Sequence, residues 1–251
     1  MTDDGLNRRL NELALRAAHT HRACFTRFLE PELADTARAA AAGAGARVEF
    51  WGGYPDAERR MAAFYSEDAP KEADWPILAL RIDWNGKFAH PGHRDLLGAV
   101  MGLGIERETT GDIAMGTYRG SDCAYLFAAR EMAEYIAASL ESAGRASVRV
   151  SVALEAPQLL PPEGQEIRVT VQNERLDAVL AATWHLSRGE AQRLVAAGLV
   201  KLNHAPNLHA DARLSEGDLI SAKGCGRARV LELAGQSRRG RQIVRLFRYG
   251  K

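Results

Sequence analysis

The chain has 251 residues, of which 46% are hydrophobic and 26% are charged, and its formal net charge is +1. This composition is typical of a globular protein with a sizeable core, and the length allows two or three domains. The sequence has no run of about 18 apolar residues, and its first residues are polar and acidic, unlike those of a signal peptide. We therefore expect a cytoplasmic protein without membrane insertion.

Three cysteines, Cys24, Cys123 and Cys225, lie far apart in the sequence. This spacing indicates reduced thiols rather than a disulfide framework or a zinc site. The pair His90 and His93 brackets a Pro-Gly turn with no third ligand at a suitable spacing. We therefore expect neither a metal nor a cofactor.

The net charge hides a difference between the two parts of the chain. Residues 1–172 carry 19 Lys and Arg against 25 Asp and Glu, a net of −6, whereas residues 173–251 carry 14 against 7, a net of +7. Residues 223–251 contain nine basic residues and a single acidic one, Glu232. A segment of this kind indicates a binding site for a polyanion.

The first block, residues 1–73, is predicted to be an α/β domain. Leu6, Leu10 and Leu13 share one helical stripe, and Pro31 suits the first turn of a second helix. The predicted elements are helices within residues 6–42, a strand at Arg47–Trp51, a turn at Gly52–Pro55, a charged helix at Asp56–Phe64 and a connection at Ala69–Pro76.

The middle block, residues 74–156, has elements in the order β-α-β-β-α-β. They are Ile77–Asp83, His93–Leu103, Asp112–Thr117, Asp122–Ala128, Arg130–Ala143 and Ser147–Leu154. This order predicts a ferredoxin-like (RRM-like) plait and an α+β fold class, an architecture that common RNA-binding modules also use. The strand at 123–127 lacks the aromatic-glycine signature of those modules, so we do not expect bases to stack on this sheet.

Residues 157–172 are rich in proline and are predicted to be a linker. The third block, residues 173–251, begins with two short amphipathic helices. Ser187 and Glu190 form a capping box for the second helix, and Gly198 ends it. Short strands follow at Val200–Asn203, Leu219–Ala222, Val230–Leu233 and Ile243–Phe247.

The third block carries a specific sequence pattern. It consists of Arg175-Leu176-Asp177, then Leu186-Ser187-Arg188 with Ala191, Gln192, Val195, Gly198, Val200 and Asn203, then Glu216-Gly217-Asp218. This pattern resembles the S-four RNA-binding domain over residues 173–225. The resemblance implies that the two helices and the adjoining strand present a basic face to a folded RNA.

Physical reasoning points to the same residues. Arg188 lies in the first turn of a helix, where unpaired backbone N–H groups and the helix dipole favour a phosphate. The amides of Gln192 and Asn203 can read base edges or 2′-hydroxyl groups. The residues expected to contact RNA are Arg175, Ser187, Arg188, Gln192, Arg193, Lys201, Asn203, Lys223, Arg227 and Arg229.

Two upstream motifs extend the resemblance over nearly the whole chain. They are Phe50-x-Gly52-Gly53-Tyr54-Pro55 and His93-Arg94-Asp95-x-Leu97-Gly98, the latter continuing to Arg107 and Gly111-Asp112-Ile113. Together they resemble the YlmH family, which is related to a photosystem II S-four domain protein. The resemblance implies a bacterial RNA-binding protein that is linked to cell division by gene neighbourhood and acts in ribosome-associated quality control on the large subunit.

The middle motif suggests a second RNA or partner site. His93, Arg94 and Asp95 open a helix, and Arg107 ends the next connection, so the four residues can meet at one edge of the plait. The alternative is a local structural role, in which Asp95 caps the helix and the glycines allow close packing.

We therefore expect a monomeric ribosome-associated factor that binds structured rRNA, and tRNA as a further candidate, on the large ribosomal subunit, and that is not an enzyme. One alternative is an adaptor linked to cell division. Another is an RNA-modifying enzyme such as a pseudouridine synthase, because some of these carry an Arg-Leu-Asp triplet at the active site. Here the triplet opens an RNA-binding helix, so we interpret Asp177 as a carboxylate at a helix N-terminus.

Overall fold

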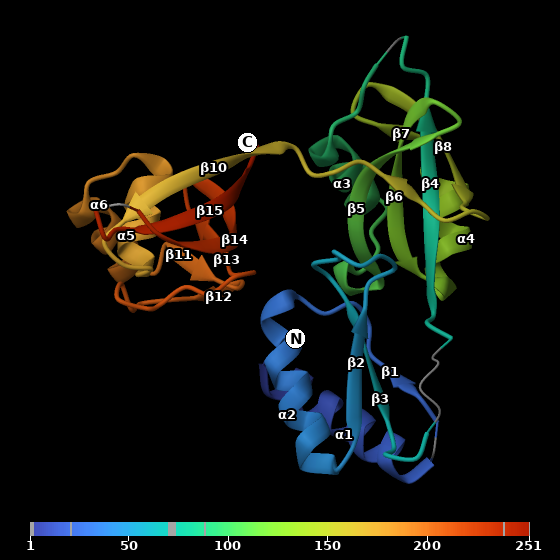
Figure 1. Cartoon of the computed structure of the whole chain (residues 1–251). Helices are drawn as coiled ribbons and strands as arrows, with labels where there is room; N and C mark the ends of the chain where they lie inside the picture. The colour runs from blue at the N-terminus through green and yellow to red at the C-terminus, as the bar shows by residue number, and fades with distance from the viewer. Residues whose placement is uncertain (1–2, 21, 70–73, 88, 238, 251) are drawn as a thin grey trace. The chain divides into compact units, whose positions relative to one another are not determined.

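The computed structural model describes residues 3–20, 22–69, 74–87, 89–237 and 239–250. The chain forms two compact units, Met1–Leu160 and Pro161–Lys251 (Figure 1). Both contain helices and sheets, which confirms the predicted mixed class. None of the described helices is long and apolar enough to cross a membrane.

The first unit begins with two helices packed on a three-stranded sheet. The elements are α1 (Asp3–Thr20), β1 (Cys24–Phe25), η1 (Pro31–Leu33), α2 (Ala34–Ala44), β2 (Arg47–Trp51) and β3 (Met61–Tyr65). The strand order is β1-β3-β2, so β3 is central. Leu10 and Ala14 of α1 pack with Ala40 of α2 and Phe64 of β3 in one core.

The predicted helix Asp56–Phe64 is wrong. Its second half is β3, in which all five residues are buried. Ala62 and Phe64 face the helices, whereas Met61 faces a second core on the other side. A strand covered on both faces appears in the sequence as a continuous apolar run, which periodicity alone does not distinguish from a buried helix.

The rest of the first unit is a six-stranded antiparallel sheet. Its elements are β4 (Ile77–Trp84), α3 (His93–Gly102), η2 (Arg107–Thr109), β5 (Thr110–Tyr118), β6 (Ser121–Ala129), α4 (Arg130–Ser139), β7 (Ser142–Ala143), β8 (Ala146–Val152) and β9 (Gln158–Leu159). The strand order is β7-β8-β4-β6-β5-β9. The four long strands and two helices follow the expected β-α-β-β-α-β order. Helix α4 is shorter than predicted because Ser142–Ala143 pairs with β8.

Both faces of this sheet are covered. On one face, Leu96 and Val100 of α3 pack with Ile136 of α4 over the sheet. On the other, Tyr125 and Phe127 of β6 are 2% and 0% exposed. Phe28 and Met61 from the N-terminal residues lie against them, and Tyr54 stacks on Phe127 at 4.9 Å between ring centroids. The rings of β6 are therefore core residues and present no open surface to a base.

Buried polar contacts join the two parts of the first unit. The guanidinium of Arg59 donates to the carbonyls of Thr110 and Arg107, at 3.1 Å each, and pairs with Glu30. The carboxylate of Asp112 accepts from the Tyr54 hydroxyl at 3.0 Å and from the backbone N–H of Glu58 at 2.7 Å. Because these groups are largely buried, the contacts fix how the N-terminal residues dock on the sheet.

The second unit is a six-stranded sheet with two helices on one face. Its elements are β10 (Gly164–Val171), α5 (Leu176–Trp184), α6 (Arg188–Ala196), β11 (Val200–Leu202), β12 (Ala205–Pro206), β13 (Leu219–Ala222), β14 (Gly226–Gln236) and β15 (Gln242–Tyr249). The strand order is β10-β15-β14-β13-β11-β12. Leu176 and Leu180 of α5 and Val195 of α6 pack against Val230 and Leu246 of the sheet.

The predicted linker 157–172 is wrong over most of its length. Gln158–Leu159 is β9 of the first unit, and Gly164–Val171 is an edge strand paired with β15. The division between the units falls between Leu160 and Pro161. The prolines mark that division, whereas the alternation of Ile167, Val169 and Val171 toward the core belongs to a strand.

Substitution of Gly53 is expected to destabilise the first unit. Gly53 has φ +99°, and a Cβ there would overlap the ring of Phe127. Gly53→Ala should therefore lower the free energy of unfolding by about 3 kcal/mol, through overpacking and backbone strain. Chemical denaturation measures this change. The matched control is Gly98→Ala in α3, where no atom lies within 4 Å of the added Cβ. It should leave stability unchanged or raise it, and equal losses in both variants would contradict the packing argument.

Candidate RNA-binding site

A buried carboxylate organises the helices of the second unit. Asp177 of α5 has no exposed side-chain surface, yet it accepts hydrogen bonds from three residues. Arg175 donates through Nε at 3.1 Å, Arg188 through Nε at 3.2 Å and Gln192 through its amide nitrogen at 2.9 Å. The structure therefore brings together three residues that the sequence predicts to contact RNA. They surround Asp177, for which the sequence predicts no RNA contact.

The local structure explains this convergence. Arg175 is the residue before the first turn of α5, so its side chain returns to Asp177 two residues later. Arg188 is the first residue of α6, and Gln192 follows it by four residues on the same face of the helix. His185, in the left-handed conformation at φ +55°, ends α5 and lets the chain reverse.

The donors control the ionisation of Asp177. Burial acts to raise the pKa of the carboxyl group, but the hydrogen bonds from Arg175, Gln192 and Arg188 outweigh burial and hold its pKa below the ordinary value. The carboxylate therefore stays charged and holds the guanidinium groups in place. The side chains of Arg188 and Arg175 remain 49% and 33% exposed, so their other surfaces face the solvent.

The start of α6 has the predicted capping box. The Ser187 hydroxyl accepts from the Glu190 N–H at 3.2 Å, and the Glu190 carboxylate accepts from the Ser187 N–H at 2.8 Å. Ser187 therefore serves first as a cap, and Glu190 is an acidic residue with a structural role. Arg193 is exposed one turn further on, where its Nε donates to the carbonyl of Gly189 at 3.3 Å.

A second group of predicted residues lines a groove of about 760 Å³. It is lined by Lys201 of β11 and by Lys223 and Arg227, which flank the Gly224-Cys225-Gly226 turn. The two glycines have φ of +83° and +126°, values that only glycine adopts without strain, and they allow the tight turn between β13 and β14. The groove thus combines basic side chains with accessible backbone.

Two predicted contacts have other surroundings. Asn203 and His204 form a hairpin turn with φ of +50° and +74°. The Asn203 amide donates to the Asp218 carboxylate at 2.7 Å and accepts from the Leu219 N–H at 2.9 Å. Both ends of the amide therefore help to close the turn, and the contact of this amide with RNA stays a prediction. Arg229 lies on β14, facing away from the core that contains Ala228 and Val230.

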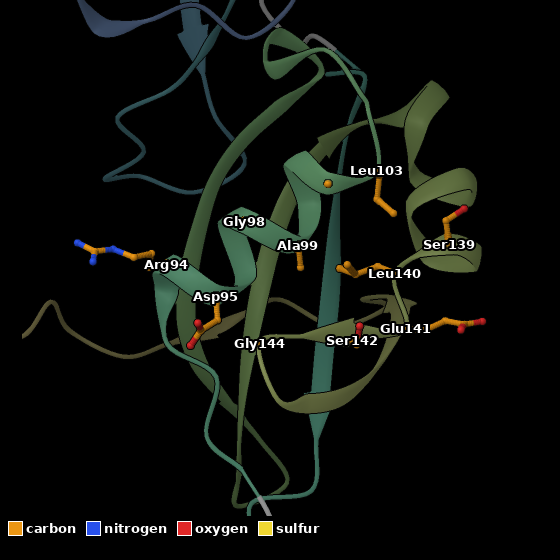
Figure 2. Close-up of a pocket in the computed structure, with 11 residues that line it drawn as sticks. Arg94, Asp95, Gly98, Ala99, Leu103, Ser139, Leu140, Glu141, Ser142 and Gly144 are labelled. Carbon is orange, nitrogen blue, oxygen red and sulfur yellow. The ribbon is translucent and has the colours of Figure 1, made fainter.

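The predicted second site does not assemble. Arg94 and Asp95 line a pocket of about 590 Å³ between α3 and the segment that follows α4. Figure 2 shows Asp95 turned toward Gly144 and Arg94 turned away from the other lining residues. Asp95 also accepts from the Gly92 N–H at 3.0 Å and so caps α3. His93, at the first position of α3, is exposed and is not among the residues lining this pocket.

Arg107 lies apart from that pocket. Its guanidinium donates to the carbonyls of Thr110 and Gly111 at 3.0 and 3.1 Å, and burial lowers its pKa. Arg107 therefore stabilises the turn into β5. Among the described residues, no group of three or more His, Cys, Asp and Glu side chains is placed to hold a metal ion.

Comparison with known proteins identifies two matching family models. One, described as "Putative RNA-binding domain in YlmH", matches residues 70–155, and the S4 domain matches residues 174–220. The "Ribosome-associated protein quality control protein P2" of Bacillus subtilis (strain 168) is 33% identical over 226 residues, which cover 89% of this chain and 86% of that protein. The chain belongs to the YlmH family. A solved structure, "Cell division protein ylmH from Streptococcus pneumoniae", is 22% identical, with a TM-score of 0.48, and covers 60% of this chain and 90% of its own.

In this YlmH-family chain the S4 match ends at residue 220. The Asp177 cluster lies inside the match, whereas Lys223, Arg227 and strands β14 and β15 lie beyond it. Sequence reasoning missed the role of Asp177. The signal that was available is the spacing of Arg188 and Gln192, which places two donors on one face of α6, although the sequence alone does not show that this face meets Asp177.

The Asp177 cluster predicts a specific pH dependence for this YlmH-family chain. Because the folded pKa of Asp177 is lowered, its stabilising effect is complete above its unfolded pKa of about 4 and is lost as the pH falls through the folded pKa. Asp177→Asn should lower the free energy of unfolding at pH 7 by about 2 kcal/mol. At pH 3 the free energies of unfolding of the variant and the wild type should differ by less. Urea denaturation at both pH values measures this. Glu163→Gln, at an exposed position of the same unit, serves as the control, and a constant difference between Asp177→Asn and the wild type across pH would rule out the ionised cluster.

Proposed function

We propose that the chain binds structured ribosomal RNA through the α5–α6 face that Asp177 organises, and that it acts without catalysis in ribosome-associated quality control on the large subunit. The main observation in support of this proposal is the Asp177 cluster. One buried carboxylate orients Arg175, Arg188 and Gln192 while leaving both guanidinium groups partly exposed. The two matched domains and the Bacillus subtilis relative support an RNA-binding, ribosome-associated role.

The geometry favours a folded RNA over a flexible chain. A guanidinium that is held by a carboxylate loses less conformational entropy when it binds a phosphate, and its planar fork matches phosphate oxygens. Two such groups at fixed positions select phosphates that are themselves at fixed positions, as in a helix or a stable loop. The basic groove at Lys201, Lys223 and Arg227 adds further contacts for an RNA backbone.

The proposed role in ribosome-associated quality control is supported by the relative. The Bacillus subtilis protein carries ribosome-associated quality control in its name, and the present chain aligns with 86% of its length. We place the present chain on the large subunit, in the cytoplasm and as a monomer, with tRNA as a further candidate ligand.

An RNA-modifying enzyme is less well supported. A catalytic carboxylate has to reach its substrate, whereas Asp177 has no exposed side-chain surface and is occupied by three donors. The likeness of its Arg-Leu-Asp triplet to a pseudouridine synthase motif is therefore explained by the structural role of Asp177.

Substitution of Arg188 tests the proposed face. Charge reversal is unsuitable, because a glutamate would stand against the buried carboxylate of Asp177. Arg188→Gln keeps a donor near Asp177 and removes the cation. It should weaken binding to the large ribosomal subunit about ten-fold in co-sedimentation at moderate salt. It should also reduce the salt dependence of the binding constant by about 0.7–0.9, the effect of one phosphate contact.

The matched control is Arg8→Gln, which removes one charge from an exposed position on α1. It should bind like the wild type, because Arg8 lies outside the proposed face and its loss changes only the net charge. Equal binding by Arg188→Gln and the wild type, with an unchanged salt slope, would assign the interaction to another surface.

A further inference from the structure

The sheet of the second unit has an outer face, which we define as the side opposite α5 and α6. Along β15, Val244 and Leu246 enter the core under the helices. Because successive side chains of a strand point to opposite faces, Phe247 and Tyr249 lie on the outer face. Phe247 pairs with Arg229 of β14. Neither ring belongs to a core cluster among the described residues.

Two aromatic rings stand together on this face. Phe247 and Tyr249 meet edge to face, with 5.1 Å between their centroids. The guanidinium of Arg227 lies over the ring of Tyr249, at 5.1 Å from its centroid. Both rings are partly exposed. Gly164 of β10 makes room for Phe247, because a Cβ at that position would lie 2.7 Å from the Phe247 ring.

Positive charge surrounds the rings. Arg229 pairs across β14 and β15 with Phe247, and its Nε is buried without a hydrogen-bond partner. A buried donor in this state is costly unless a ligand or water completes it. Lys201 extends the same row, because it pairs with Ser221, which in turn pairs with Arg227.

The opposite end of β15 has a different character. The guanidinium of Arg245 pairs with Glu232 at 2.6 Å and with Glu166 at 3.0 Å, so its charge is compensated within the sheet. Basic residues and aromatic rings occur together only toward the other end, where Arg227 and Arg229 lie beside Tyr249 and Phe247 among the described residues of the outer face. Proteins that hold single-stranded nucleic acid combine these two features, because rings stack on bases and cations follow the backbone.

We propose that this end of the outer face binds an unpaired RNA segment, with a base stacked on the ring of Tyr249 and the adjacent phosphates contacted by Arg227 and Arg229. This inference rests on the proposed RNA-binding function and adds a second RNA-binding surface to the unit. The Asp177 face recognises folded RNA, whereas the outer face recognises single strands and shares Lys201 and Arg227 with the groove. Charge complementarity favours RNA over a protein partner, since the rings are bordered by cations.

Fluorescence with two RNA probes tests the proposal on the full chain. One probe is a uridine-rich oligomer of about ten nucleotides carrying a single 2-aminopurine, and the other is a stable RNA hairpin. Tyr249→Leu removes the ring, and Tyr249→Phe is the matched control that keeps it. Tyr249→Leu should weaken oligomer binding about ten-fold and abolish the quenching of 2-aminopurine, with hairpin binding unchanged, whereas Tyr249→Phe should behave like the wild type.

Arg229→Gln provides an independent variant that leaves both rings in place. It should weaken oligomer binding several-fold, so the proposal stays testable if Tyr249→Leu does not fold. Unaltered oligomer binding and quenching in folded variants would overturn the inference. Hairpin binding by the wild type without any oligomer binding would also overturn the inference. In that case the outer face would be assigned to a protein partner, and the proposed function would stand. Failure of the wild type to bind either RNA would instead remove the proposed function itself.

Discussion

A carboxylate that has left water is stable only where cations and hydrogen-bond donors replace its hydration. Asp177 meets this requirement with donors from two helices, since Arg175 precedes α5 whereas Arg188 and Gln192 belong to α6. The same contacts therefore fix the packing of α5 on α6 and the direction of two arginines. The charge that stabilises the fold thereby also orders the proposed binding face, because the guanidinium groups are held in place in the absence of a phosphate.

The first unit has the opposite arrangement, in that its sheet offers no open face. Modules with a similar element order bind RNA through aromatic rings on the sheet. Here Tyr125 and Phe127 of β6 are covered by Phe28, Met61 and Tyr54. Arg59 and Asp112 hold that cover in place through contacts with backbone groups of both parts. Any RNA contact within residues 70–155 therefore uses helices, loops or sheet edges.

Local patterns in the sequence predicted local structure well. Strands Arg47–Trp51 and Leu219–Ala222 have the predicted bounds, and the Ser187–Glu190 capping box forms as expected. The failures involve residues whose environment is set by distant segments. Met61–Tyr65 reads as part of a helix because its second cover, the β6 core, lies about 60 residues away. Asp177 reads as a helix-end carboxylate because its partners Arg188 and Gln192 follow only after a turn whose direction the sequence does not specify.

The basic composition of the last residues overstates the charge available to RNA. Arg245 is compensated by Glu166 and Glu232. Arg248 lies on the helix side of the sheet, where its Nη1 donates to the carbonyl of Thr183 at 3.4 Å. Of the other basic residues in this segment, Lys223 lines the groove, Arg229 lies on the outer face, and Arg227 belongs to both surfaces. Because the salt dependence of binding counts phosphates that are contacted at the same time, its slope reports how many of these surfaces one RNA engages.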